Sequence, residues 1–194
     1  MTTSDLAGQV LLQSDGGVTQ LSGSIATNEL LLGGDDISEE GAGFFNLVGP
    51  NQVNVLAASL DDSLLFANTT DLKIDSVTYL FDDGTSETHA GISTSNDDVN
   101  LLVDGNLTIQ QTVDLGTGDL LLDVEGDASQ IASGTIDAGG LALQVEGVTV
   151  LNEDNDISVL AINSNGAVEV SNFCLLYTSP SPRDQRGSRM PSSA

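Results

Sequence analysis

Carboxylates are the side chains in this sequence with the most evident capacity for chemistry, and many of them are clustered. The densest group comprises Asn152, Glu153, Asp154 and Asp156. Ca²⁺ prefers oxygen ligands of this kind, so these four residues are the candidate ligands of a Ca²⁺ site. The sequence contains no EF-hand loop and no Gly-Gly-x-Gly-x-Asp nonapeptide, and the alternative interpretation is a group of solvated acids in a turn. No other cofactor is predicted.

Side chains suited to catalysis are scarce. His89 is the only histidine and lies between two acid-rich turns. A Ser-His-Asp triad needs a nucleophile and an orienting acid beside the histidine, and no Gly-x-Ser-x-Gly sequence occurs. We therefore predict that His89 is a solvated loop residue and that the chain is not an enzyme. Paired carboxylates can hydrolyse a glycosidic bond, which leaves a polysaccharide-acting enzyme as the alternative.

The charge balance excludes several classes of partner. The chain has 29 acidic and 4 basic residues and a formal net charge of −25. Lys73 is the only Lys or Arg before residue 174. Such a surface repels nucleic acid and anionic lipid, so we expect no nucleic-acid binding. No apolar run is long enough to cross a bilayer as a helix, so we expect no membrane insertion by this segment.

The elements that position these residues belong to a unit that occurs twice, about 105 residues apart. Gly8–Leu32 aligns with Gly118–Leu143, and Leu47–Asn68 aligns with Leu151–Asn172. The polar identities between the copies are Gln20/Gln130, Asn51/Asn155 and Asn68/Asn172. A fixed-period repeat of short apolar segments is typical of an elongated array and not of a compact enzyme.

Short apolar segments with period-two alternation, separated by Gly, Asn and Asp, predict an all-β protein with few helices. The main apolar segment returns every 21 residues, at Val99, Leu120 and Leu141. This spacing suits one rung of a parallel β-helix, or solenoid, and predicts roughly 8 rungs and a rod of roughly 40 Å. The alternative is a set of tandem β-sandwich repeats, since the longer period is close to one immunoglobulin-like domain.

One segment differs in length between the copies. Gly33–Asn46 separates the matched blocks of copy one, whereas the shorter Gln144–Val150 does so in copy two. The extra residues of copy one predict a loop that projects from a rung, and its acids Asp35, Asp36, Glu39 and Glu40 are candidate recognition residues. Neutral variation on a tolerant surface is the alternative.

The composition changes sharply after Phe173. Residues 174–194 contain three of the four prolines, three of the four basic residues and the only cysteine. The string LLYTSPSPRD in this segment resembles the translated sequencing-adaptor read-through that ends some environmental open reading frames. We therefore interpret residues 174–194 as a disordered, non-native tail. A native disordered Pro/Ser-rich C-terminus is the alternative.

Within residues 1–173, the predicted solenoid comprises copy one at about 8–68, connecting rungs at 69–117 and copy two at about 118–172. The segment from Gly91 to Gly147 resembles the repeats of filamentous-haemagglutinin-type adhesins and autotransporter passengers, in the order strand, Gly-Asn-Leu-Thr-Ile, strand, Gly-Thr-Gly-Asp, then Ile-x-Ala-Gly-Gly-Leu. Ile157–Ala161 followed by Gly166-Ala-Val is similar to them too.

This resemblance implies a right-handed parallel β-helix in a secreted or outer-surface protein of a Gram-negative bacterium. The implied role is that of a rigid display rod in adhesion. Its partners would be a glycan or protein of a host or neighbouring cell surface, and further rungs would adjoin both ends. The first residues lack a signal peptide, so we expect the chain to be a fragment with its export signal upstream. A free-standing, Ca²⁺-stabilised secreted acidic module is a further alternative.

Overall fold

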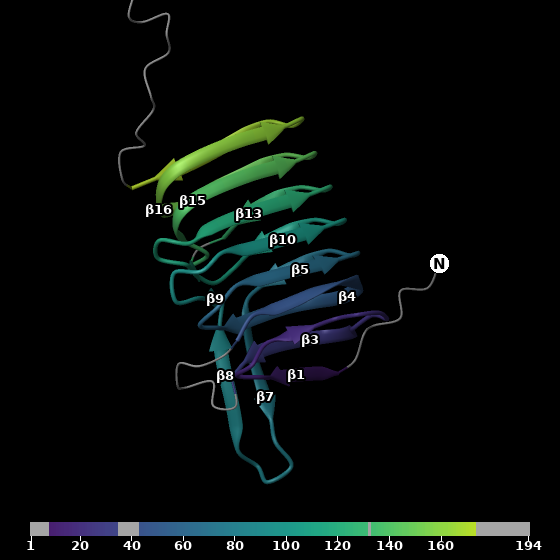
Figure 1. Ribbon diagram of the computed structural model, residues 1–194. Coiled ribbons are helices and arrows are strands. Elements are labelled where there is room, and N and C mark those ends of the chain that lie inside the picture. The colour runs from purple at the N-terminus through teal and green to yellow at the C-terminus, as the bar shows by residue number, and fades with distance from the viewer. Residues whose placement is uncertain (1–7, 35–42, 132, 174–194) are drawn as a thin grey trace, which may run out of the picture.

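The computed structural model describes residues 8–34, 43–131 and 133–173, and these residues form strands, turns and no helix (Figure 1). All but two of the strands join one continuous parallel sheet that winds into a stack of rungs. Neighbours in this sheet are strands from successive turns of the winding, such as β5, β10 and β13. No helix in the described part of the chain is long and apolar enough to cross a membrane.

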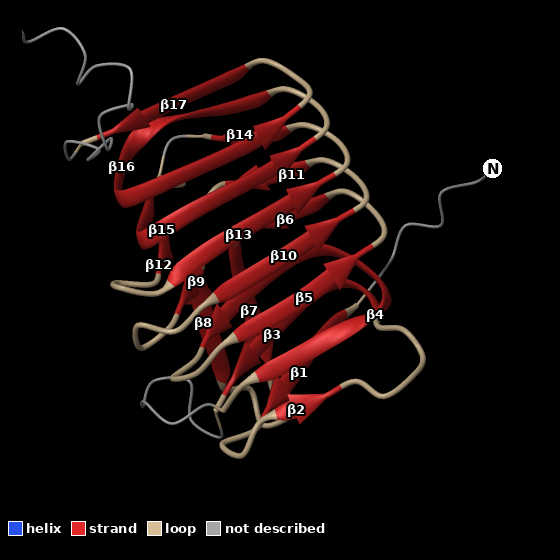
Figure 2. Cartoon of the chain, turned by 45° about the horizontal axis from the view of Figure 1, so that its top comes forward, coloured by secondary structure: helices blue, strands red, loops and turns tan. Residues whose placement is uncertain are grey.

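The winding has three faces, which the chain visits in the order A, B, C (Figure 2). Face A carries β2 (Val18–Thr19), the start of β4 (Phe45–Ser59), β5 (Leu64–Asn68), β10 (Val99–Val103), β13 (Asp119–Val124) and the later parts of β15 (Ile136–Val145) and β16 (Thr149–Ser164). Face B carries β1 (Gln9–Gln13), β3 (Ala26–Gly33), the middle of β4, β6 (Leu72–Ile74), β11 (Leu107–Ile109), β14 (Ala128–Gln130), the start of β16 and β17 (Val168–Asn172). Face C carries the end of β4, β9 (Ile92–Ser93), β12 (Val113–Asp114), the start of β15 and the middle of β16.

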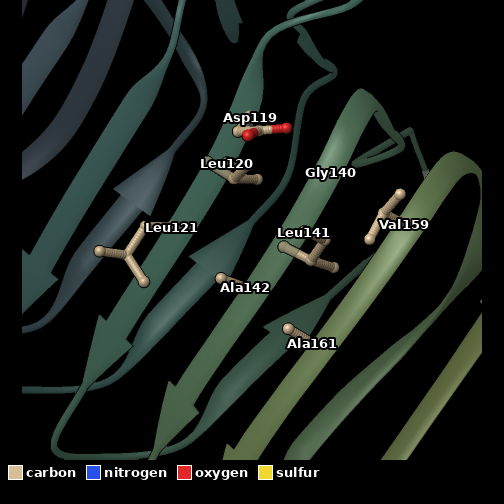
Figure 3. Close-up of a pocket in the computed structure, with 8 residues that line it drawn as sticks. All are labelled: Asp119, Leu120, Leu121, Gly140, Leu141, Ala142, Val159 and Ala161. Atoms are coloured by element: carbon tan, nitrogen blue, oxygen red, sulfur yellow. The ribbon is translucent and has the colours of Figure 1, made fainter.

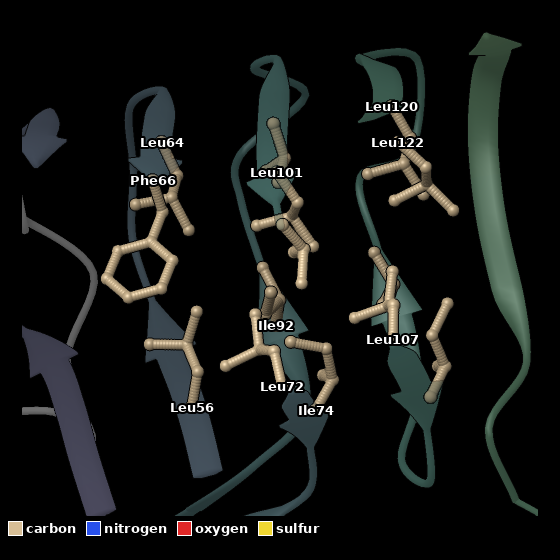
Figure 4. Packing of buried hydrophobic residues seen from close by; sticks show 14 of the residues in the cluster. Leu56, Leu64, Phe66, Leu72, Ile74, Ile92, Leu101, Leu107, Leu120 and Leu122 are labelled. Atoms are coloured by element: carbon tan, nitrogen blue, oxygen red, sulfur yellow. The ribbon is translucent and has the colours of Figure 1, made fainter. Parts of the chain in front are cut away.

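The core lies inside the winding, where apolar side chains of each rung stack on apolar side chains of the next. In the register of face A, Leu64 pairs with Val99, Val99 with Leu120 and Leu120 with Leu141. All four side chains are buried, and Figure 4 shows Leu64 and Leu120 within the packed interior. Because side chains alternate along a strand, every second residue points into this interior and its neighbours point outward. The stack needs no large aromatic residue beyond Phe45 and Phe66, which are buried in its lower rungs.

Turns between faces A and B hold the rungs together through side chains. Oδ1 of Asp71 accepts a hydrogen bond from the N–H of Asn106 at 2.8 Å, and Oδ1 of Asn106 accepts one from the N–H of Asp127 at 2.9 Å. Oδ1 of Asp127 in turn accepts one from the N–H of Val148 at 2.7 Å. Glycine is required beside these contacts, since a Cβ at Gly126 would lie 2.6 Å from Oδ1 of Asn106.

A buried polar corner explains why the two copies share Gln and Asn. Oδ1 of Asn51 accepts hydrogen bonds from Nε2 of Gln20 at 2.9 Å and from the N–H of Ile25 at 2.8 Å. Its Nδ2 donates to the carbonyl oxygens of Leu47 and Ala67, each at 3.1 Å. The side chain of Asn51 is fully buried, and the corner satisfies backbone groups where the chain bends inside the rod.

Copy two repeats this corner with Asn155 in the place of Asn51. Oδ1 of Asn155 accepts from Nε2 of Gln130 at 2.7 Å and from the N–H of Ile136 at 2.9 Å. Its Nδ2 donates to the carbonyl oxygens of Leu151 at 3.3 Å and Ser171 at 2.9 Å. The two corners lie at different positions around the rod, because the corresponding parts of β4 and β16 lie on neighbouring faces. The start of β4, which precedes Asn51, lies on face A, whereas the start of β16, which precedes Asn155, lies on face B.

The remaining two strands, β7 (Ser76–Leu80) and β8 (Ser86–Ala90), form an antiparallel hairpin inserted between β6 and β9. Figure 1 shows this hairpin crossing the outside of the lower rungs, and β7 contacts β1, β3 and β4. The buried Val77 of β7 packs with Leu31 and Ala57 in a small apolar cluster outside the main core. The insertion thus covers part of the rod without interrupting the stacking of β6 on β4 and β9 on β4.

The predicted all-β parallel solenoid is confirmed, with rungs of about 21 residues. The alternative of tandem β-sandwiches is wrong, because every strand pair apart from β7–β8 is parallel. The rod has about seven rungs, where sequence spacing predicted roughly 8, since the hairpin takes up residues outside the stack. Strands β6 and β7 are separated by Asp75 alone, and the apolar alternation shifts by one residue there, from Leu72 and Ile74 to Val77 and Tyr79. Residues 174–194 lie outside the described residues, so the interpretation of the tail stays a prediction.

Candidate functional site

The predicted Ca²⁺ ligands lie within strand β16 and not in a turn. The side chains of Asn152, Asp154 and Asp156 are exposed, whereas Glu153 is half-buried. Among the described residues, no three Asp, Glu, His or Cys side chains gather closely enough to hold a metal ion. Ca²⁺ binding at these four positions therefore stays a prediction that rests on the sequence. The predicted recognition residues Asp35, Asp36, Glu39 and Glu40 lie outside the described residues.

Face C carries a row of carboxylates that are separated in the sequence and adjacent in the sheet. Asp114 of β12 pairs in register with Asp137 of β15, and Asp137 pairs with Asp156 of β16. Asp137 is exposed, but desolvation by the atoms around its carboxyl group raises its pKa, and the negative charges of Asp114 and Asp156 raise it further. Like charges opposite one another on neighbouring strands are unfavourable. We refer to Asp114, Asp137 and Asp156 as the acidic row.

His89 lies on strand β8, so the prediction of a solvated loop histidine is wrong. Its ring is partly buried between the hairpin and the rod, and Nε2 lies 3.5 Å from Oγ of Ser93. Burial lowers the pKa of His89, and a hydrogen bond with the backbone of Ala58 opposes this effect. Local sequence does not indicate this burial, because the residues around His89 in β8 are polar or small.

The outward side of the lower rungs carries apolar residues that the hairpin covers. Leu11 of β1 pairs in register with Leu31 of β3, and Leu31 pairs with Ala57 of β4. Leu31 and Ala57 are 0% exposed although they point away from the main core, because Val77 and Tyr79 of β7 pack on them and their neighbours. We call this surface the covered face.

The corresponding residues of copy two form an open groove on face A. In the aligned repeat, Leu121, Ala142 and Ala161 take the places of Leu11, Leu31 and Ala57. They too pair in register, across β13, β15 and β16. The groove has a volume of about 260 Å³ and an almost wholly apolar lining. We call this surface the open face.

Figure 3 shows how the open face is built from three strands. Leu121 of β13 and Val159 of β16 stand on its two sides, with Gly140 and Ala142 of β15 between them. Gly140 has no side chain and Ala142 has a small one, so the middle strand forms a shallow floor. Val159 is 65% exposed, which is unusual for a residue whose counterpart Val55 packs against the covered apolar cluster.

A run of three leucines was the signal in the sequence that could have identified these faces. Leu30–Leu32 and Leu120–Leu122 are continuous apolar runs and not alternating ones. Such runs occur where a strand is covered on both sides, so the middle leucine of each run predicts an outer layer. The structure supplies that layer over Leu31 and leaves Leu121 in a groove.

The described residues thus offer an apolar open face, an acidic row and a covering hairpin as the features able to interact with other molecules. The open face is the one with a concave shape, and its residues come from three successive rungs. Comparison of the chain with protein-family models, with curated proteins and with solved structures gives no match.

Proposed function

We propose that this chain is part of a large secreted or cell-surface bacterial adhesin-like protein, in which it acts as a rigid, non-catalytic display rod. The observation that carries the proposal is the unbroken parallel sheet that winds through about seven rungs. A solenoid of this kind contacts only neighbouring rungs, so it lengthens by repetition and presents side chains at regular spacing along its faces. The resemblance of the repeats to those of filamentous-haemagglutinin-type adhesins agrees with this role.

The use of the polar side chains supports a structural role. Asp71, Asn106 and Asp127 hold successive turns together, and Asn51 and Asn155 satisfy the corners. These groups accept hydrogen bonds from the backbone, so they are not available as a convergent catalytic set. The partner of the rod would be a glycan or protein of another cell surface, and the strongly acidic body favours a partner that is not itself anionic.

Bead adhesion tests this proposal directly. The full chain, attached through its N-terminus to fluorescent beads, should bind a subset of a panel of bacterial and epithelial cells more strongly than beads carrying an unrelated acidic protein. The reducing ends released from a panel of polysaccharides should stay at the level of the buffer control. Absence of adhesion to every cell type at physiological salt would contradict the adhesive role.

The acidic row is the observation that favours a second candidate function, a polysaccharide-acting enzyme. Carboxylates on neighbouring strands of a sheet are about 4.8 Å apart at their backbones, and a raised pKa suits a general acid. The row includes one such group, Asp137. Release of reducing ends that Asp137→Asn abolishes and Asp104→Asn retains would establish this function in place of the display rod.

A further inference from the structure

We propose that the open face is the docking site of a separate β-hairpin, one that carries apolar side chains on one face and Lys or Arg along its edge. This inference concerns a binding partner of the rod and does not depend on the adhesive role proposed above. It rests on two independent comparisons within the chain. One concerns the apolar residues of the two copies, and the other concerns the charges beside them.

The first comparison shows what kind of element the surface accepts. The covered face and the open face have the same three-strand arrangement, with counterparts at each position of the register. On the covered face an antiparallel hairpin lies across the strands and buries Leu31 and Ala57 completely. The covered face therefore shows that an antiparallel hairpin packs well on this three-strand arrangement.

The shape of the open face agrees with this assignment. Ala142 replaces Leu31, and Gly140 replaces Glu29, so the floor is lower than on the covered face. A hairpin residue larger than Val77 would fill the extra depth. Leu and Ile are the residues that add one methylene group to Val without adding a polar group, and we expect one of them at the central position of the partner.

The second comparison defines the charge of the partner. Beside the covered face, Nε2 of Gln9 donates to the carbonyl oxygen of Thr78 at 2.7 Å, and Nε2 of Gln13 donates to Oε2 of Glu87 at 3.3 Å. The counterparts of these two donors are the carboxylates Asp119 and Asp123. A carboxylate accepts hydrogen bonds and does not donate them, so the edge of the partner must carry donors.

The same charges disfavour a second copy of this chain as the occupant. Its hairpin β7–β8 contains Asp82, Asp83 and Glu87 and has no Lys or Arg. Docking it on the open face would bring Glu87 to the position where Asp123 replaces Gln13, and two carboxylates would then face each other. A hairpin with Lys or Arg at that position pairs favourably with both Asp119 and Asp123.

The experiment measures binding of cyclised hairpin peptides to the full chain by fluorescence anisotropy at physiological salt. The basic probe carries Leu and Tyr on one face and Lys at the edge positions. One control peptide has the same composition in an order without an apolar face, and another has the sequence of Ser76–Ala90. We expect the basic probe to bind at least about tenfold more tightly than either control, because only it satisfies both the groove and the two carboxylates.

Two pairs of variants locate the binding. Val159→Asp should weaken the basic probe about tenfold, whereas Leu80→Asp should have no effect, since Leu80 is a similarly exposed residue (63% against 65%) outside the groove. Asp119→Asn combined with Asp123→Asn should weaken it about threefold to tenfold, and Asp82→Asn should not. Circular dichroism and the melting temperature of each variant identify any loss of folding.

Several results would overturn the proposal. Equal binding of the composition control would show a general attraction between opposite charges. Binding unaffected by Val159→Asp would place the site elsewhere. A dimer in light scattering that Val159→Asp dissociates would make a second copy the occupant. Binding lost on removal of residues 174–194 would assign the interaction to that segment.

Discussion

At the scale of single residues, the fully buried Asn51 and Asn155 are positions where substitution should be costly. Asn51 and Asn155 each use both ends of the side-chain amide to satisfy four groups inside the rod. This explains why both copies have Asn at this position. A shorter or purely apolar side chain would leave the same backbone groups without partners.

Asn155→Ala should lower the free energy of unfolding by about 3 kcal/mol or more, because a buried polar group without a partner costs about 1–3 kcal/mol. Urea denaturation followed by circular dichroism measures this change. Asn163→Ala is the matched control, since Asn163 is exposed on the same strand and should change stability by less than about 0.5 kcal/mol. Equal stabilities of the two variants would contradict the assigned role of the corner.

The acidic row leads to a second prediction, which concerns the effect of Asp137 on stability. The native pKa of Asp137 is raised, so the folded state holds a proton there more tightly than the unfolded chain does. Stability from this group is therefore present at low pH and decreases as the pH rises from about 4 through the native pKa. Asp137→Asn removes the repulsion and should raise the melting temperature at pH 7 by about 1–4 °C.

Two further measurements test the origin of that gain. The difference between Asp137→Asn and the unmodified chain should disappear below about pH 4, where the carboxyl group is protonated in both states. It should also shrink in about 1 M NaCl, because the carboxylates of the row are exposed to solvent. A gain that is the same at every pH would point to a change in packing and not to charge.

At the scale of elements, the hairpin is held to the rod through a group that titrates. Burial lowers the pKa of His89, so the unfolded chain binds a proton more tightly than the folded one. The stability contributed by neutral His89 is complete above about pH 6.5 and is lost as the pH falls through the lower native pKa. Protonation would place a charge against the rod, next to Ala58.

We therefore expect the hairpin to open more often in acid. Amide hydrogens of β7 and β8 should exchange faster relative to those of β10 and β13 at pH 5 than at pH 7.5, after correction for the intrinsic effect of pH. Mass spectrometry of hydrogen exchange measures this ratio. His89→Gln should abolish the pH dependence, and a variant that retains it would assign the effect to another group.

The strands differ in how well the sequence predicts them. The bounds of Val99–Val103 and Leu107–Ile109 can be recognised in the sequence, since apolar alternation is interrupted there by the turn Asp104-Gly105-Asn106. Strand β8 was missed, because Ser86–Ala90 contacts the rod through few apolar atoms and has no alternating pattern. Its place depends on contacts between residues far apart in the sequence, which local periodicity does not report.

The candidate site was predictable only in part, because it too depends on contacts between residues far apart in the sequence. The sequence indicates repeated units and therefore the presence of a second copy of every surface. It does not show that Leu121 lies in a groove, because the hairpin that covers Leu31 belongs to a stretch between the two copies. Which surfaces are covered follows from the path of the insertion, and that path is determined by tertiary packing.

At the scale of the whole molecule, charge opposes folding along the entire rod. Residues 1–173 contain 28 acidic residues and one basic residue, Lys73, and acids of successive rungs lie in register at Asp114, Asp137 and Asp156. Self-repulsion of this kind destabilises a compact state and is reduced by salt. The hydrogen bonds that Asp71 and Asp127 accept from backbone N–H groups offset part of this repulsion, because each places a negative charge next to a donor.

The melting temperature should consequently rise by about 5 °C or more between about 0.01 and 1 M NaCl, as the screening length falls from about 30 to about 3 Å. At equal ionic strength, screening alone predicts the same rise in MgCl₂ and CaCl₂. The predicted Ca²⁺ site at Asn152, Glu153, Asp154 and Asp156 requires an additional rise in CaCl₂ that Asp154→Asn removes. Differential scanning fluorimetry separates the two effects, and equal curves for Ca²⁺ and Mg²⁺ would contradict the Ca²⁺ site while leaving the role of net charge intact.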